Sequence, residues 1–244
     1  MSKIWPLYKR EFKAYFVTPI AYIFMVIFLL LCGLLTFYAG LFFQRGQADL
    51  QPFFEFHPWI YLIFVPALSM RLWAEERKSG TFELLLTLPL SPIQAVLGKF
   101  LAAWTFAGLT LLLTFPFWIT VNYLGEPDNG TILLSYIASF ILAGSFLSIG
   151  TALSAFTKNQ VIAFISTLSL GLLFVLSGFP IVTDFFYQWV PTVIVNAIRD
   201  FSFMTNFETM TKGVIDLRHI VFFTTFIGIF LFINTLALEA KKAD

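Results

Sequence analysis

The sequence has few charged residues for its length and almost no cysteine. Charged residues make up 12% of the 244 residues, and 15 Lys and Arg against 14 Asp and Glu leave a net charge of +1. This balance excludes the basic surface that nucleic-acid binding requires. The single cysteine, Cys32, excludes a disulfide framework or a cysteine-based zinc site within the chain. With 59% hydrophobic residues, including 32 Phe, the composition indicates a membrane protein.

Motifs for ATP hydrolysis and for ion-driven transport are also missing. A P-loop requires G-x-x-x-x-G-K-[ST], but the pair Gly98-Lys99 has Ile93 in place of the first glycine and Phe100 in place of the hydroxyl residue. We also expect no ionisable side chain in the buried part of any span, because Arg71 and His219 lie at predicted membrane ends. ATP hydrolysis through a P-loop in this chain is therefore excluded. An ion-driven pump is disfavoured.

Long stretches without charge define the membrane segments. These stretches are residues 14–44, 100–125, 129–157, 159–183 and 219–238. As helices rising 1.5 Å per residue, each can cross about 30 Å of hydrocarbon. A shorter stretch, 56–70, becomes long enough only if its helix continues through Ala74. Six spans place both termini on one side of the membrane, which favours counting this stretch as a span.

The sequence thus predicts an all-α integral membrane protein whose residues 1–244 form one domain. The six predicted spans are 17–43, 56–76, 92–124, 130–157, 159–182 and 218–238. Residues 1–16 are predicted to form an amphipathic interfacial helix, because aromatic residues recur there at three- and four-residue steps. The alternative is a positively charged flank without a separate helix. Pro19 marks the expected bend into the first span.

The distribution of Lys and Arg predicts the orientation. With both termini in the cytoplasm, most of the 15 basic residues lie inside, and Arg45, Arg199, Lys212 and Arg218 lie outside. The first span cannot be a cleavable signal peptide, since its apolar stretch is about twice the usual length. We therefore expect a multi-pass protein of a bacterial inner (cytoplasmic) membrane.

The cytoplasmic segment between the second and third spans carries the most information. Gly80 permits a sharp turn and Pro89 stops a helix, so residues 80–88 are predicted to form a helix of about two turns. A helix this short requires a docking surface to be stable. Ser91 and Gln94 then form a predicted capping box that opens the third span. The alternative is an ordinary interfacial loop with a leucine-rich turn.

Serine and histidine residues are the candidates for an enzymatic site in this sequence. The stretch 144–150 contains Ser145 and Ser148 but does not fit G-x-S-x-G, and no histidine is expected within a span to act as base. His57 and His219 are too few and too far apart for a metal site. We interpret this stretch as helix packing, because small residues recur at four-residue spacing. These residues are Ser135, Ser139, Ala143, Gly144, Ser148 and Ala152.

The segment from Glu76 to Lys99 resembles the first cytoplasmic loop of ABC-2 type transporter permeases. The matching residues are Gly80-Thr81, Glu83, Leu84-Leu85, Pro89, Ser91 and Gly98-Lys99. The resemblance extends over the whole chain and is greatest for the gliding-motility (GldF type) permeases. That closer match is carried by residues 156–164, Phe207-Glu208 and 212–218.

The resemblance implies that residues 80–88 are a coupling helix that docks in a cleft of a separate ATPase subunit. The implied coupling residues are Glu75, Glu76, Arg77, Gly80, Thr81, Phe82, Glu83, Leu84, Leu85 and Leu88. It further implies two ATPase subunits that bind ATP and Mg, and a second permease half, identical or related. No cofactor or metal is implied in this chain.

The segment 183–217 is implied to form short outer re-entrant helices between the fifth and sixth spans. Its aromatic residues would form an outer gate, comprising Phe185, Phe186, Tyr187 and Trp189. An auxiliary membrane protein with a large extracytoplasmic domain is a further implied partner. The expected function is export of an amphipathic or lipid-like cargo. The alternatives are a non-transporting membrane scaffold that anchors an extracytoplasmic partner, and an intramembrane hydrolase acting through Ser145 or Ser148.

Overall fold

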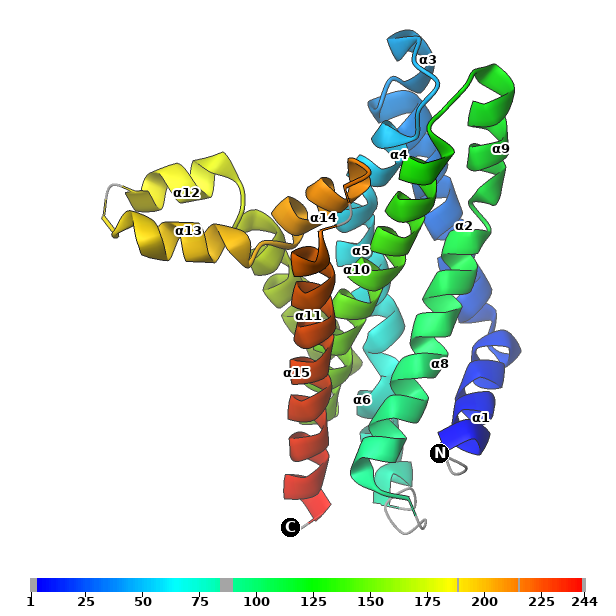
Figure 1. The fold of residues 1–244 in the computed structure, drawn as a ribbon. Helices are drawn as coiled ribbons and strands as arrows, with labels where there is room; N and C mark the ends of the chain where they lie inside the picture. Colours follow the sequence, from blue (N-terminus) through cyan, green and yellow to red (C-terminus); the bar gives the residue numbers. More distant parts are fainter. Residues whose placement is uncertain (1–3, 84–89, 188, 215, 243–244) are drawn as a thin grey trace.

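The structure is a computed structural model that describes residues 4–83, 90–187, 189–214 and 216–242. Every regular element in these ranges is a helix (Figure 1). The N-terminal half contains α1 (Ile4–Val17), α2 (Pro19–Leu34), the π-helix η1 (Leu35–Ala39), α3 (Phe42–Arg45), α4 (Gln51–Glu55), α5 (His57–Ser69), α6 (Arg71–Ser79), α8 (Pro92–Leu112) and α9 (Phe115–Leu124). The C-terminal half contains α10 (Asn129–Phe156), α11 (Gln160–Leu176), α12 (Pro180–Tyr187), α13 (Thr192–Asp200), α14 (Phe203–Thr211) and α15 (Leu217–Lys242).

Four helical stretches are long and apolar enough to cross a membrane. They are Pro19–Arg45, Pro92–Leu124, Asn129–Phe156 and Leu217–Lys241. A fifth is counted if α11 and α12, which are bent by 72° at a break, form one span. The predicted span 56–76 is not among them, because α5 and α6 are separate helices that meet at Met70 and neither is long enough alone. The chain is therefore a multi-pass membrane protein, and a six-span count stays a prediction.

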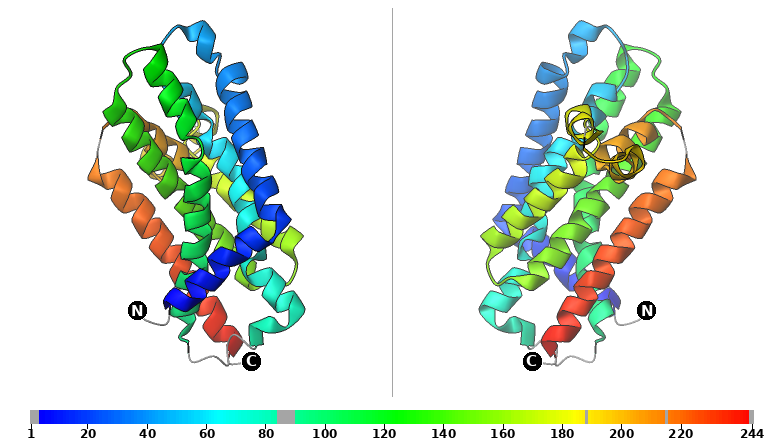
Figure 2. Two further views of the ribbon diagram at one scale, coloured as in Figure 1. Left: turned by 90° about the vertical axis from the view of Figure 1, so that its right-hand side faces the viewer. Right: turned by 90° about the vertical axis from the view of Figure 1, so that its left-hand side faces the viewer.

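The helix α10 lies at the centre of the bundle and packs against α5, α8, α11 and α15 (Figure 2). Its small residues permit this close packing, as the four-residue spacing predicts. A Cβ atom at Gly144 would lie 2.8 Å from the Trp104 ring, and one at Gly150 would meet the Ser69 side chain. The spans that contain α2 and α15 are the least buried of the four, with 28% and 33% of their most apolar stretch buried.

The N-terminal helix α1 crosses α8 obliquely (Figure 2), and its placement at the membrane interface stays a prediction. Leu7 of α1 is buried over Gly98 of α8, and Tyr15 stacks on Phe106 at 4.7 Å. Thr18 ends this helix in an extended conformation, and Pro19 occupies the first turn of α2. The chain therefore breaks between α1 and α2 at Thr18, directly before Pro19.

The segment after α11 leaves the bundle. Helices α12 and α13 form a hairpin that projects sideways, and α14 returns against α10 (Figure 1). Phe203 of α14 is buried and packs at 5.2 Å on Phe174 and at 4.9 Å on Phe226. This aromatic cluster fixes the base of the hairpin to the bundle.

Candidate functional site

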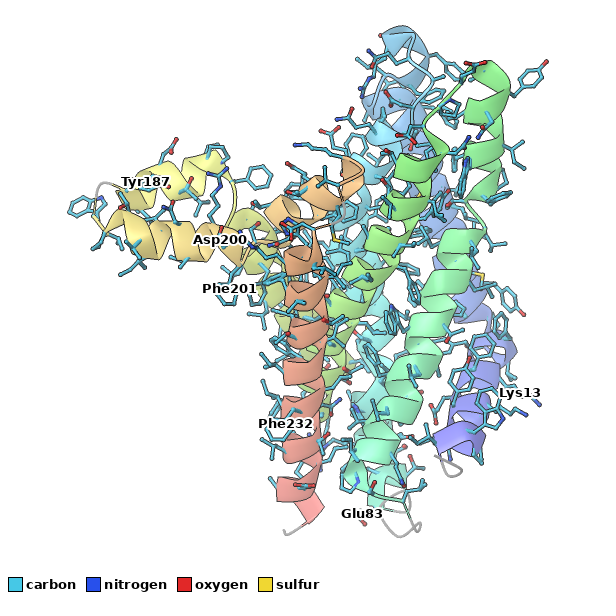
Figure 3. All side chains as sticks on the ribbon, in the orientation of Figure 1. Lys13, Glu83, Tyr187, Asp200, Phe201 and Phe232 are labelled. Carbon is cyan, nitrogen blue, oxygen red and sulfur yellow. The ribbon has the colours of Figure 1, made fainter. Side chains whose placement is uncertain are left out.

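The helix α6 leads into the segment 80–88, which is predicted to couple to a partner. It extends from the inner part of the bundle and ends at Gly80, whose φ of 76° lies in the left-handed region that favours glycine. Glu83 follows Gly80 and lies at the end of the bundle where the two termini also lie (Figures 1 and 3).

The three charged residues of α6 that are predicted for coupling have different contacts. Glu75 is half-exposed and accepts a hydrogen bond of 2.9 Å from Arg71 Nε. Glu76 lies 2.8 Å from Lys99 Nζ. Arg77 donates a 2.9 Å bond from Nη1 to the Ala155 carbonyl at the end of α10. Glu76 and Arg77 therefore contact other helices of the bundle, and Glu75 is the most exposed of the three.

The remaining predicted coupling residues divide between surface and interior. Thr81 and Glu83 are exposed. Phe82 is buried and packs edge-on against Trp73, with ring centroids 6.1 Å apart. Phe82 thus anchors the segment to α6 and is closed to a partner. The predicted residues Leu84, Leu85 and Leu88 lie outside the described residues.

Lys99 is the centre of a buried ion cluster that the sequence analysis missed. Its side chain is 3% exposed, and Nζ lies 2.8 Å from Glu76 Oε1 and 3.1 Å from Glu11 Oε2. The ammonium also lies 5.1 Å from the centroid of the Trp73 ring. The cluster joins α1, α6 and α8 at the base of the segment 80–88. The expectation of no ionisable group buried in a span is therefore wrong at Lys99, because two carboxylates compensate its charge.

The ion cluster also sets the protonation of Glu11. Burial by itself raises the pKa of the Glu11 carboxyl, but the Lys99 ammonium and the Arg10 guanidinium together outweigh it and lower the pKa below its ordinary value. Arg10 Nη2 lies 2.6 Å from Glu11 Oε1 and 3.9 Å from Glu76 Oε1. Glu11 is therefore held as a carboxylate at neutral pH.

A serine of α10 fixes the junction between α5 and α6. Ser154 Oγ accepts 3.1 Å bonds from the backbone N–H groups of Trp73 and Ala74 and donates a 3.1 Å bond to the Met70 carbonyl. The first N–H groups of a helix lack partners within that helix, so Ser154 caps α6 from a neighbouring helix. The same end of α10 is also bound by Lys241, which donates to the Ala155 carbonyl at 2.6 Å.

The predicted outer-gate residues lie on or next to the projecting hairpin, where Figure 3 labels Tyr187. The exposed fraction is 62% for Phe185 and 78% for Trp189, and Phe186 and Tyr187 are also exposed. Tyr187 Oη donates a 2.7 Å bond to Asn196 Oδ1 of α13, which holds the two hairpin helices together. These side chains therefore form an apolar surface and do not meet across an opening within this chain.

The serine residues considered for catalysis are bonded within their own helix. Ser145 Oγ donates to the Ile141 carbonyl at 3.2 Å, and Ser148 Oγ donates to the Ser145 carbonyl at 2.7 Å. His57 of α5 is fully buried within the bundle, and its Nδ1 lies 2.9 Å from Ser139 Oγ. Ser139 also bonds Tyr61 at 2.8 Å and is itself buried, so this pair is closed to a substrate.

No group of three or more possible metal ligands occurs among the residues that the structure describes. The described residues form an all-helical membrane protein, in which the ion cluster ties α6 to α1 and α8. A family profile described as ABC-2 family transporter protein matches residues 5–237. The chain therefore belongs to the ABC-2 family, whose members are membrane components that work with ATPase subunits in ABC transporters. A search of curated proteins finds no match to this chain.

Proposed function

We propose that this chain is the permease subunit of an ABC exporter and that its segment 80–88 is the coupling helix for a separate ATPase. The observation that carries the proposal is the anchoring of α6, which leads into that segment. Glu76 binds Lys99 of α8 and Arg77 binds the end of α10, so a displacement at residue 80 is transmitted to both helices. Family membership supports the need for an ATPase partner.

In the proposed cycle, ATP and Mg bind to two ATPase subunits, which close and push the coupling segments. Two permease halves, identical or related, then rock against each other. Both termini are proposed to lie in the cytoplasm of a bacterial inner membrane, with six spans per half. The closer relationship to GldF-type permeases, and an auxiliary subunit with a large extracytoplasmic domain, belong to the same proposal.

The proposed cargo is amphipathic or lipid-like. Lys99 is paired with two carboxylates, so it offers no free charge to a charged solute in passage. The exposed aromatic side chains of the α12–α13 hairpin suit the outer leaflet, where Phe185 and Trp189 would narrow the exit.

The test is recovery of an ATPase with the tagged chain, purified in mild detergent from its native membrane. Glu83→Arg reverses an exposed charge beside the proposed docking surface, and Glu126→Arg makes the same exchange at an exposed position on the predicted opposite side. We expect a P-loop ATPase to co-purify with the native chain and with Glu126→Arg, and to be lost from Glu83→Arg. Recovery of no ATPase under conditions that preserve other complexes would contradict the proposal and favour a membrane scaffold.

A further inference from the structure

A groove with both charged and apolar walls lies between α1, α2 and the α5–α6 junction. Its volume is about 270 Å³. At one end it is lined by Glu11, Arg71 and Glu75, and Lys99 and Glu76 of the ion cluster also reach it. The other end is lined by Ile20 and Phe24 of α2 and by Ala67 and Leu68 of α5. The groove is therefore charged at one end and apolar at the other.

The apolar end of the groove lies within a membrane span. Ile20 and Phe24 belong to the first two turns of the span that begins at Pro19. The charged end is formed by α1 and α6, which are not among the candidate spans, and by Lys99 near the start of the span Pro92–Leu124. The groove thus crosses the boundary where that span begins. A ligand that fills it has a charged head outside the hydrocarbon and an apolar part within it.

The charges of the wall define the head of such a ligand. Three carboxylates and two cations line the groove, so the wall has an excess of one negative charge. Lys99 is already occupied by Glu11 and Glu76. Arg71 and Glu75 are paired with each other but are 29% and 48% exposed in their side chains, so both are open to a ligand. An anion and a cation on the same molecule would satisfy this pair.

The geometry points to a binding site for an aminophospholipid, with its phosphate on Arg71 and its primary ammonium on Glu75. Within the part of the chain that the structure describes, Arg71 donates to Glu75 from Nε and Nη2, which leaves Nη1 for a phosphate oxygen. A primary ammonium donates hydrogen bonds to carboxylates, whereas a choline group has none to donate. The acyl chains lie along Ile20 and Phe24.

The site is tested by lipid binding, which is independent of ATPase coupling, so its failure would leave the proposed function standing. The tagged chain with its co-purifying subunits is exchanged into mixed micelles that contain equal amounts of phosphatidylethanolamine, phosphatidylcholine and phosphatidylglycerol. Bound lipid is then counted by native mass spectrometry. We expect retention of phosphatidylethanolamine about tenfold above each of the other two, the effect of one charge-assisted contact.

Variants separate the two halves of the headgroup. Arg71→Gln lowers retention of phosphatidylethanolamine and phosphatidylcholine together, and Glu75→Gln removes the preference between them. Arg45→Gln, at an exposed residue far from the groove, leaves retention unchanged. The unfolding temperature of each variant is also measured. It should equal that of the native chain, because an exposed ion pair contributes little stability.

Several outcomes would overturn the site. Equal retention of the three lipids by the native chain, or a preference for phosphatidylglycerol, contradicts the charge assignment. Full retention in both folded variants contradicts the residues. The last measurement adds soluble phosphoethanolamine, which has the headgroup without the acyl chains. If it displaces the lipid at a comparable concentration, the apolar end contributes nothing to the affinity, and this would contradict a lipid as the ligand.

Discussion

Lys99 lies in an otherwise uncharged helix and has three close contacts. Its ammonium is held by Glu11 and Glu76 and lies over the Trp73 ring. Removing a buried charge from its partners costs more than removing an exposed one, because the partners stay buried and unpaired. The cluster therefore binds α1, α6 and α8 together only as long as all its charges are present.

Lys99→Met should lower the free energy of unfolding by about 3–5 kcal/mol, the usual effect of removing one partner from a buried ion pair. The measurement is thermal unfolding of the purified chain in detergent or nanodiscs. Lys13→Met makes the same change at an exposed position of α1 (Figure 3) and should have little effect. Equal stability of the two variants would show that the cluster does not hold the helices together.

The Glu11 carboxylate should make stability depend on acid pH. Its pKa is lowered in the folded chain, so its contribution is present above the ordinary carboxyl pKa of about 4.3 and is lost as the pH falls through the lowered value. In Glu11→Gln this part of the pH dependence should disappear. Unfolding temperatures between neutral pH and about pH 3 give the two profiles. Parallel profiles would contradict the assignment.

The sequence predicts single residues well where one local rule decides. Gln94 Oε1 accepts a 3.1 Å bond from the Ser91 N–H, as the capping pattern predicts. Lys99 and Glu11 were missed because 88 positions separate them along the chain, and only the packing of α1 on α8 brings them together. A lone Lys before a long apolar run was the available signal for a buried, compensated cation.

At the scale of the elements, the junction of α5 and α6 depends on α10. Ser154→Ala removes the cap on Trp73 and Ala74 and leaves the Met70 carbonyl without its donor. We expect faster hydrogen exchange in the first turn of α6 and a loss of about 1–3 kcal/mol of stability. Ser166→Ala is the matched control, since that hydroxyl bonds carbonyls of its own helix. Unchanged exchange in α6 would contradict the capping role.

The close approach of α5 and α10 should be equally sensitive. A methyl group at Gly150 would overlap Ser69, so Gly150→Ala should destabilise the chain by about 1–3 kcal/mol. Gly228→Ala in α15 has open space around it and should cost nothing. Thermal unfolding of both variants distinguishes the two sites, and a tolerated methyl group at Gly150 would show that the helices are further apart.

Helical content could be predicted from the charge-free stretches, but the breaks within it could not. The first predicted span contains a π-helical turn at Leu35–Ala39 and a left-handed Leu41. The second is divided at Met70, where Ser154 supplies the hydrogen bonds. Hydrophobic periodicity reports which residues avoid water, and it does not report where a neighbouring helix satisfies a broken backbone.

At the scale of the whole molecule, the bundle has one rigid end and one extended arm. The base of α6 is tied to α1, α8 and α10, whereas the α12–α13 hairpin projects away from the bundle with exposed aromatic side chains (Figure 1). The sequence indicated a membrane protein with a short docking segment and an apolar segment before the last helix. The direction of the hairpin depends on the 72° bend between α11 and α12, which composition does not encode.

A cross-link next to the end of α6 tests directly whether an ATPase docks there. Cys32 is buried, so Glu83→Cys introduces an exposed thiol at this end of the bundle, and Glu126→Cys introduces one at the predicted opposite side. In native membranes with a short thiol-reactive cross-linker, we expect Glu83→Cys to capture an ATP-binding subunit and Glu126→Cys to capture none. Capture of no ATPase at position 83, with both thiols shown to react, would contradict the account.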